Sequence, residues 1–522
     1  MNNGNTGAYA PYYQVKKRPA CEYTKAERWY AAAAFAVSFL LLKAFTKATE
    51  GTGFGLMSSV AAIAVTVFNM LFCRYFGMRG SRTTKTIFVM NILLSLSFFI
   101  CDNGAVQFLS GLLVFAGNAY YSYASYKEGR RSVLNNAFRS IFLSPFYEFG
   151  SLFGALFNKH NTSEEKKNKA DIKKYLPIIA GLVLSIPVCV AVAVLLDSAD
   201  SAFGSIFRFD FDWLEDFSDI IISNLYIIIM AVPLAMYIFS AVYSRAYKMH
   251  HEGDLDKLPQ SNTRVLPVSM CAAFLTPLSV MYVLFVALQI IHAVSASVFK
   301  SPDFTYSEYA REGFFQLCTV AVINLAVISA VMFFSKEKRA KGLLAIFVTV
   351  FCALTLCLIV TALSKMLLYI SIYGMTPKRI HTSVFMIYLF VMFTVLIVKQ
   401  FKYEISFTKT GYCLAAAVLI ALAFVPVDRL IARYNITHYM SGDISWMGSS
   451  AMYDLDLSAV PEFASLIEDD TEAGGDARYF FNDRKYLARS CENMTAWDFN
   501  IPRYIAGKTI MENQPNNGGY FQ

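Results

Sequence analysis

Long hydrophobic runs alternate with short polar segments along the first 426 residues of the chain. A helix crosses the hydrocarbon core of a bilayer with about 20 mostly apolar residues. The third and tenth runs, 86–100 and 383–398, are shorter than this, and flanking Arg and Lys side chains that snorkel can extend them. The runs predict transmembrane helices at 29–45, 53–72, 86–100, 106–124, 177–196, 220–242, 265–294, 314–334, 342–363, 383–398 and 411–426. We therefore predict an all-α polytopic membrane protein with about eleven transmembrane helices.

The composition agrees with a membrane protein. Hydrophobic residues make up 56% of the 522 residues and charged residues only 16%, whereas an ordinary soluble domain is about 25% charged. This balance excludes a soluble enzyme, a nucleic-acid-binding domain and a disordered chain, so the lipid bilayer is the expected partner and nucleic acid is not.

The positive charges are not spread evenly between the loops. The chain holds 46 Lys and Arg against 38 Asp and Glu, a formal net charge of +8. Basic residues concentrate in alternate loops, such as 73–85, 125–176 and 335–341. Since basic loops stay in the cytoplasm, the N-terminus is predicted inside, and an odd number of spans places the C-terminus outside.

These boundaries divide the chain into a transmembrane part and a small, mostly helical extracytoplasmic domain. Six Phe residues recur at three- and four-residue spacing, which places their rings on one helical face and predicts a helix on the inner leaflet or against the cytoplasmic end of the bundle. They are Phe138, Phe142, Phe146, Phe149, Phe153 and Phe157. The predicted parts are a cytoplasmic tail (1–28), the transmembrane domain (29–426) with that interfacial helix at about 131–158, the C-terminal domain (427–510) and a disordered tail (511–522).

The predicted C-terminal domain is small enough to depend on the membrane part for stability. Trp497, Phe499 and Tyr504 are predicted to form its small core, and 465–478 is predicted to be an acidic loop. A stripe of Tyr479, Phe480, Tyr486 and Leu487 predicts one or two helices.

The chain shows no pattern typical of a catalytic or metal site. The predicted spans hold no Asp or Glu, and the 10 Cys and 6 His have no metal-ligand spacing. We therefore predict no catalytic residue, metal or cofactor. Buried amides such as Asn69, Asn91, Asn118 and Asn324 are predicted to bond one helix to another.

Polar side chains gather in three segments that the predicted topology brings to the outer face. Arg forks suit phosphate and carboxylate groups, and Tyr suits amphipathic headgroups, so the set predicts a site for an anionic lipid or a wall polymer. The alternative is structural: Arg311–Glu312 and Asp428–Arg433 would be ion pairs that lock the C-terminal domain onto the bundle. The candidate residues are Arg311, Glu312, Lys365, Tyr369, Tyr373, Arg379, Asp428, Arg433 and Asn435.

Several segments resemble a bacterial family of multi-pass membrane proteins that is known only as a domain of unknown function. They are YAREGFFQL from residue 309, YGMTPKR from 373, DRLIARYNI from 428 and WDFNIPRYIA from 497. The resemblance covers roughly 301–379 and 426–507. It implies a protein of the bacterial cytoplasmic membrane and brings no known activity, cofactor or catalytic residue.

Three functions follow from these observations. The favoured one is a non-enzymatic envelope receptor, sensor partner or scaffold that binds an anionic lipid or wall component, with a possible membrane protein partner. The alternatives are a transporter or lipid flippase, and an intramembrane transferase on a lipid-linked substrate with Glu312 or Asp428 as the base. A pocket lined by a carboxylate with a strongly raised pKa would favour the transferase.

Overall fold

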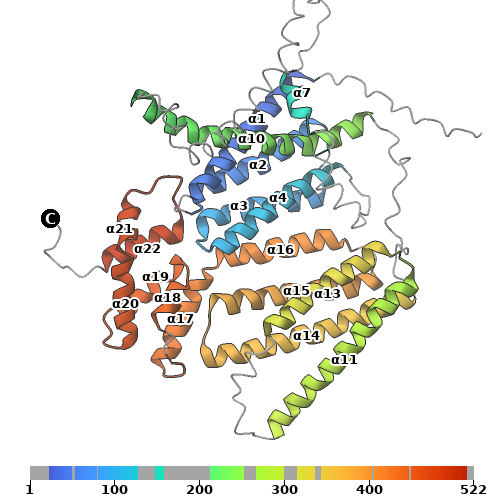
Figure 1. Ribbon diagram of the computed structural model, residues 1–522, viewed down its shortest axis with the longest axis vertical. Helices are drawn as coiled ribbons and strands as arrows, with labels where there is room; N and C mark the ends of the chain where they lie inside the picture. The colour runs from blue at the N-terminus through green and yellow to red at the C-terminus, as the bar shows by residue number, and fades with distance from the viewer. Residues whose placement is uncertain are drawn as a thin grey trace, which may run out of the picture. The chain divides into compact units, whose positions relative to one another are not determined.

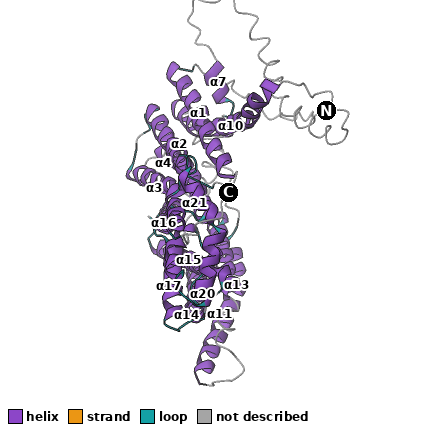
Figure 2. Cartoon of the chain, turned by 90° about the vertical axis from the view of Figure 1, so that its left-hand side faces the viewer, coloured by secondary structure: helices purple, strands orange, loops and turns teal. Residues whose placement is uncertain are grey.

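A computed structural model shows that the described part of the chain is built from helices. It describes residues 23–49, 53–78, 80–126, 146, 149–157, 212–251, 266–298, 314–335, 342–402, 405–445 and 448–513. Within these ranges there is no strand, only a β-bridge between Leu266 and Ser335 (Figure 2). The predicted all-α fold is confirmed.

The helices up to residue 424 include the predicted spans that lie in the described ranges (Figure 1). They are α1 (Lys25–Lys47), α2 (Leu56–Tyr75), α3 (Arg82–Ile100), α4 (Gly104–Tyr126), α7 (Ser151–Phe157), α10 (Asp212–His251), α11 (Val268–Val298), α13 (Phe314–Phe334), α14 (Leu343–Tyr373), α15 (Pro377–Phe401) and α16 (Phe407–Phe424).

The chain is a multi-pass membrane protein, but the count of eleven spans is not confirmed. Among the described residues, nine helices are long and apolar enough to cross a membrane. The span predicted at 106–124 corresponds to α4, which is 23 residues long but is not one of the nine. Its polar YYSYASY end explains this difference. The span predicted at 177–196 lies outside the described residues.

Several helices begin where the sequence supplies a capping side chain. Ser81 accepts a hydrogen bond from Thr84 N at 3.3 Å before α3. Thr376 accepts one from Arg379 N at 3.4 Å before α15, whose first residue is a proline. Such side chains satisfy backbone donors that have no partner inside the helix, so these sequences fix where the helices start.

Two groups of helices form most of the membrane part. In the first, α3 packs against α2, α4 and α16; in the second, α14 packs against α11, α13 and α15. Helix α16 also contacts α15 and so joins the two groups. The packed parts of these helices belong to the compact unit formed by residues 33–149 and 227–522.

The other compact unit consists of residues 1–32 and 150–226. In it, Gly154 of α7 lies so close to the Tyr23 ring that a Cβ at this position would stand 2.5 Å from the Tyr23 hydroxyl oxygen. Helix α7 falls in the interfacial helix predicted at about 131–158, most of which lies outside the described residues.

Buried amides connect neighbouring helices, as predicted. Asn69 of α2 donates to the backbone oxygen of Asn118 in α4 at 2.8 Å. Asn91 of α3 accepts from the Tyr412 hydroxyl of α16, and Asn324 of α13 accepts from the Tyr282 hydroxyl of α11 at 2.7 Å. These bonds satisfy polar groups that lipid cannot solvate.

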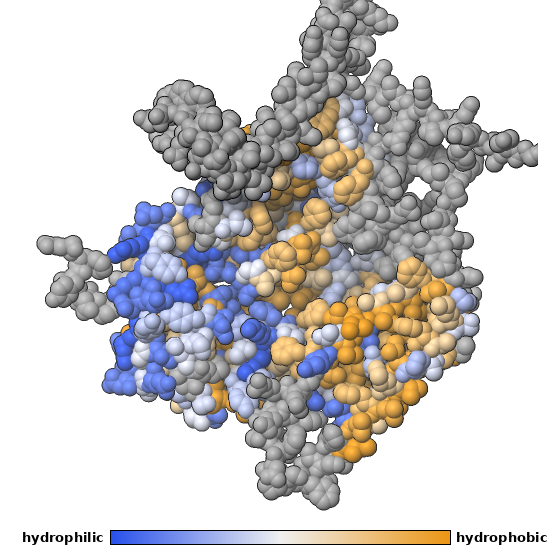
Figure 3. Space-filling view, in the orientation of Figure 1, coloured by the Kyte–Doolittle hydropathy of each residue, from blue (hydrophilic) through white to orange (hydrophobic). Residues whose placement is uncertain are grey.

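The surface divides into an apolar and a polar region. Exposed side chains on α11 and α14 are mostly Leu, Ile, Val, Phe and Met, including Leu284, Leu288, Ile346 and Leu367. Figure 3 shows hydrophobic residues over these helices and hydrophilic residues over the C-terminal helices. An apolar surface of this kind is expected where helices face lipid.

After Pro426 the chain forms a compact helical domain. Its elements are α17 (Val427–Met440), α18 (Ser449–Tyr453), η4 (Leu457–Ala459), α19 (Val460–Phe463), η5 (Ala464–Leu466), α20 (Glu472–Asp483), α21 (Lys485–Glu492) and α22 (Ile501–Glu512). The acidic loop predicted at 465–478 is wrong, because η5 and α20 occupy much of that range.

The predicted core of this domain is also wrong. Tyr504 is 42% exposed, and the core is built from small and aliphatic side chains around Phe463 and Phe480. Trp497 and Phe499 lie instead in the connection between α21 and α22. The apolar stripe is right for Phe480 and Leu487 and wrong for Tyr479 and Tyr486, which are exposed.

Candidate functional site

The C-terminal domain supplies the missing cap of a membrane helix. Gly55 precedes α2 and provides no capping side chain, so the first amides of this helix need other partners. Leu56 N donates to the backbone oxygen of Phe499 at 2.8 Å, and Met57 N donates to that of Ala496 at 3.2 Å. The start of α2 is therefore bonded directly to the segment before α22.

The residue that precedes α2 has to be small. A Cβ on Gly55 would lie 2.1 Å from the carbonyl oxygen of Trp497, which is inside any real contact distance. Only glycine lets the two backbones approach closely enough for the capping bonds to form.

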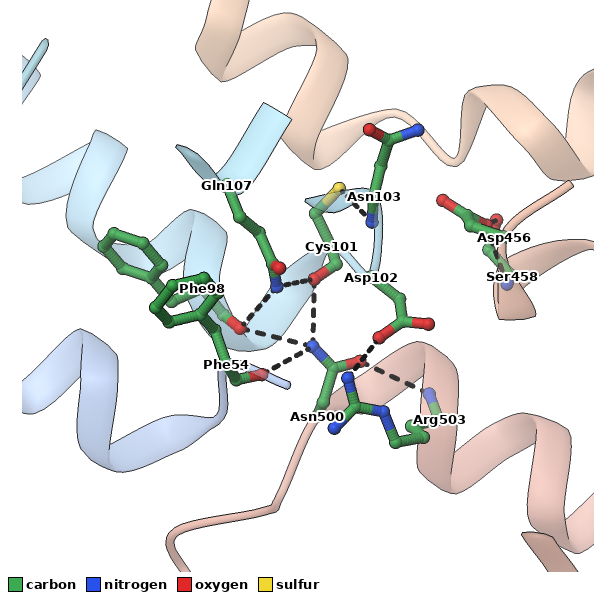
Figure 4. A network of polar contacts seen from close by, with 10 residues as sticks. All are labelled: Phe54, Phe98, Cys101, Asp102, Asn103, Gln107, Asp456, Ser458, Asn500 and Arg503. Carbon is green, nitrogen blue, oxygen red and sulfur yellow. Dashed lines mark hydrogen bonds and ion pairs between the residues drawn. The ribbon is translucent and has the colours of Figure 1, made fainter. Parts of the chain in front are cut away.

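Asn500 connects the C-terminal domain to the end of α3. Its side chain is fully buried, and its Nδ2 donates to the carbonyl oxygens of Cys101 at 2.9 Å and Phe98 at 3.2 Å, with a longer contact of 3.4 Å to that of Phe54 (Figure 4). Its Oδ1 accepts from Arg503 N at 3.3 Å and so caps α22. One side chain thus serves the ends of two helices.

An ion pair lies beside this amide. Arg503 Nη2 of α22 stands 2.5 Å from Asp102 Oδ1 in the turn between α3 and α4 (Figure 4). The two side chains are only 16% and 11% exposed. Burial raises the pKa of Asp102, while the charge of Arg503 acts in the opposite direction. Replacement of either residue alone would leave the other as an uncompensated buried charge, so each side chain requires its partner.

A cavity of about 40 Å³ opens next to the ion pair, between the helix ends and the C-terminal domain. A space of this size holds roughly two or three water molecules. Its polar lining comes from the α3–α4 turn, from α15 and from the first part of the C-terminal domain. The residues that supply it are Asp102, Asn103, His381, Asp428, Asp456 and Ser458.

Two carboxyl groups share this cavity, and we call them the acidic pair, Asp428 and Asp456. Asp456 N donates to Asp428 Oδ2 at 3.1 Å. Asp456 Oδ1 accepts from Ser458 N at 2.9 Å and from the Ser458 hydroxyl. Asp428 is 2% exposed, and its Oδ1 has no hydrogen-bond partner among the described residues.

The acidic pair titrates closer to neutrality than ordinary carboxyl groups do. Burial raises the pKa of Asp456 to about 6, and the charge of Asp428 adds to this effect. Burial also raises the pKa of Asp428, while hydrogen bonds from Asp456 and Asn103 to its carboxyl group act in the opposite direction. The nearby cation, Arg503, is already paired with Asp102. The acidic pair therefore lacks a full counter-charge when both groups are ionised.

The lining does not form a metal site of the usual kind. Among the residues that the structure describes, no group of three or more His, Cys, Asp or Glu side chains could hold a metal ion. The cavity offers the carboxyl oxygens of Asp428 and Asp456, and one of these oxygens, Asp428 Oδ1, accepts no hydrogen bond from a described residue. Such a lining suits protons and hydrogen-bond donors.

The predicted site residues of α14 and α15 form a turn. The Arg379 guanidinium lies 4.1 Å from the centre of the Tyr369 ring, and Tyr369 and Tyr373 pack with ring centres 5.0 Å apart. Arg379 also donates to the carbonyl oxygens of Tyr373 and Gly374. These contacts close the end of α14, as cations near a helix C-terminus do.

Asn435 holds this turn against α17. Its Nδ2 donates to Met375 O and its Oδ1 accepts from Met375 N, both at 2.8 Å. Gly374 has a φ of +75°, and a Cβ there would lie 2.8 Å from Asn435 Oδ1. Asn435 and Asp428 are seven residues apart, so they share the face of α17 that meets the helix ends.

The structure describes three of the four predicted cations. Arg311, like Glu312, lies outside the described residues. Lys365 is buried in α14, and Arg379 is engaged in its turn. Arg433 is exposed and lies two residues from the buried Asn435, hence on the opposite face of α17. Binding of an anionic ligand by these residues stays a prediction.

The ion pair predicted between Asp428 and Arg433 is wrong. Asp428 is buried beside Asp456, whereas Arg433 is exposed on the other face of α17. Arg429 forms the ion pair of this helix instead, with Glu462 at 2.7 Å. The contact between the domain and the helices uses Arg503 and Asp102, which sequence reasoning did not select.

Two signals in the sequence point to the missed residues. The segment Gly53–Phe54–Gly55 precedes a long apolar run without a capping side chain, which indicates a cap from elsewhere. Asn500, followed by a proline two residues later, has the pattern of a helix start. Neither signal identifies the partner segment.

The membrane helices also enclose an apolar cavity of about 100 Å³ between α1, α2, α4 and α10. Its amides belong to Asn69 and Asn118, which are bonded to each other and to Thr66. The Tyr237 hydroxyl also lines this cavity and has no hydrogen-bond partner among the described residues, so the transport alternative stays a prediction.

The fold and the site define a multi-pass membrane protein with a helical domain bonded to one end of its helices. A family model described as "Domain of unknown function (DUF4153)" matches residues 88–466, so the chain belongs to this family. The match includes the acidic pair and stops before Asn500, and it starts well before the segments that resemble the family in sequence. No curated protein and no solved structure matches the chain.

Proposed function

We propose that the protein is a non-enzymatic receptor or scaffold of the bacterial cell envelope, with its N-terminus inside and its C-terminal domain outside. The observation that carries the proposal is the direct capping of α2 by Ala496 and Phe499. Because those bonds satisfy amides that α2 cannot satisfy itself, any displacement of the domain alters the end of a membrane helix. A ligand on the domain is thereby coupled to the helices.

The proposed ligand is an anionic lipid headgroup or wall polymer. Arg433 and Lys378 are exposed, on α17 and at the start of α15 respectively. Arg379 lies beside Lys378 but is held by the turn, so its share in binding is smaller. Exposed cations of this kind attract anionic surfaces in a salt-dependent way.

Binding is tested with the full chain in nanodiscs by titrating phosphatidylglycerol vesicles, with phosphatidylcholine vesicles as the neutral control. The Arg433→Ala and Lys378→Ala double variant should weaken binding several-fold at low salt. Lys508→Ala is the matched control, because Lys508 is an exposed cation of the same domain that pairs only within α22. Equal binding by all variants contradicts the proposed ligand class.

A second candidate function is the transferase, which the acidic pair favours. Asp456 has a pKa of about 6, so one carboxyl group can accept a proton near neutral pH. Asp428 is the base proposed from the sequence, while Glu312 lies outside the described residues. Incubation with radiolabelled lipid-linked sugar and a wall-polymer acceptor tests it: transfer that Asp428→Asn abolishes supports this function, and no transfer by the native protein counts against it.

A further inference from the structure

We propose that the cavity beside the acidic pair binds a small cation that carries N–H donors, namely an ammonium ion or the ammonium head of a primary amine. This inference does not depend on the receptor function, because the cavity lies on the face of α17 opposite Arg433.

The first argument is the acceptor that lacks a donor. Asp428 is 2% exposed, lines the cavity and has an Oδ1 without a hydrogen-bond partner among the described residues. A buried carboxylate oxygen left without a donor loses its hydration without compensation, which destabilises the folded protein. A ligand that donates an N–H to this oxygen removes that cost.

The second argument is charge. The charged and titratable groups around the cavity are Asp428, Asp456, Asp102, His381, Cys101 and Arg503. Arg503 balances Asp102, so the acidic pair carries excess negative charge once both members ionise. Close like charges in a site of low dielectric constant favour a bound cation or a bound proton.

The third argument concerns the kind of cation. The described residues offer no set of three or more side chains that could hold a metal ion. A cavity of about 40 Å³ has room for an ammonium group with one or two water molecules. The acceptors are carboxyl oxygens, to which an ammonium group can donate hydrogen bonds without the complete shell of ligands that a metal ion needs.

Occupation of this site would strengthen the contact between the domain and the helices. Asp428 and Asp456 belong to the C-terminal domain, whereas Asn103 comes from the α3–α4 turn and His381 from α15. A cation held between them replaces repulsion within the acidic pair by attraction to both members.

The test measures ligand-induced thermal stabilisation of the purified full chain at pH 7.5 and constant ionic strength. Methylammonium chloride is compared with tetramethylammonium chloride, which has the same charge but no N–H donor, and with sodium chloride. Methylammonium should raise the Tm in a saturable way, and the other two salts should not. Equal rises in Tm with sodium and methylammonium would show that N–H donors are not required and would overturn the proposal. No rise in Tm with any of the three salts would mean that the acidic pair binds only protons and would also overturn it.

Variants separate this site from general salt effects. Asp428→Asn should abolish the methylammonium-dependent rise in Tm, whatever its own Tm. Asp454→Asn is the matched control, because Asp454 is an exposed acid of the same segment. Asp456→Asn, which is nearly isosteric, gives a second variant should Asp428→Asn fail to fold. A rise in Tm that survives in both pair variants overturns the assignment.

The pH dependence gives an independent signature. Protons compete with the cation for the acidic pair, and the pKa of Asp456 is about 6. The apparent Kd for methylammonium should therefore be constant above pH 7 and rise about tenfold for each pH unit below 6. An apparent Kd that does not change between pH 5 and pH 8 contradicts binding at the acidic pair.

Discussion

Replacement of Asn500 by alanine should loosen the C-terminal domain from the membrane helices. The amide of Asn500 bonds to the end of α3, and its oxygen caps α22. Alanine removes both functions at once. It also leaves an empty space, because the Asn500 side chain is fully buried in the native protein.

The size of the effect follows from the individual contacts. Loss of an Asn cap costs about 1 kcal/mol. Loss of the buried amide bonds adds about 1–2 kcal/mol, at the lower end because Gln107 still donates to Phe98 O at 3.0 Å and to Cys101 O at 2.7 Å. The opening of the docked contact should therefore become easier by about 2–3 kcal/mol.

Hydrogen exchange at the start of α2 measures this opening. The amides of Leu56 and Met57 are bonded to carbonyl oxygens of the C-terminal domain, so they exchange when the domain moves away. A change of about 2–3 kcal/mol corresponds to exchange about 30- to 150-fold faster in Asn500→Ala than in the native protein.

A matched control is available in the same helix. Asn513 ends α22, and its amide donates only to Thr509 O at 2.8 Å, so Asn513→Ala should leave exchange at Leu56 and Met57 unchanged. Exchange in Asn500→Ala that increases less than about threefold would refute the reasoning, since this is below about 1 kcal/mol.

Three further changes test other contacts. Gly55→Ala should destabilise the protein by about 1–3 kcal/mol in thermal unfolding, because its Cβ meets Trp497 O, whereas Gly104→Ala meets no atom within 4 Å and should be neutral. Asn435→Ala should cost about 1–3 kcal/mol and speed exchange of the Met375 amide, which loses its partner. Native stability should fall as pH rises from about 4 to about 6, because Asp456 binds its proton more tightly in the folded protein than in the unfolded chain. A pH series of Tm values should show this decrease in the native protein and not in Asp456→Asn.

The sequence predicted the membrane helices well because their signal is local. An apolar run of sufficient length becomes a helix in lipid whatever its neighbours are, so each predicted span that the structure describes coincides with a helix. The count of eleven is not confirmed, because α4 is not among the nine helices apolar enough to span and the span predicted at 177–196 lies outside the described residues. Tyr369, Tyr373 and Arg379 were selected as ligand-binding candidates, and the structure brings them together at the turn between α14 and α15.

The candidate site was harder to predict because its contacts join distant segments. Asn500 and Cys101 are 399 positions apart, and no periodicity links them. Asp428 was selected for an ion pair with Arg433, yet the face of α17 on which each lies depends on what the helix packs against. The small core of the C-terminal domain was misassigned because Phe499 and Trp497 stand in the connection that caps α2 rather than inside the domain.

The most direct test of the account is a disulfide between the two segments that meet at the start of α2. Met57→Cys with Ala496→Cys places two thiols where Met57 N donates to Ala496 O at 3.2 Å. Mild oxidation in native membranes, followed by mass spectrometry, should reveal a disulfide between residues 57 and 496 in high yield. The single variant Met57→Cys should form no disulfide at residue 57. Absence of that bond, with the introduced cysteines reactive toward other partners, would contradict docking of the C-terminal domain on α2.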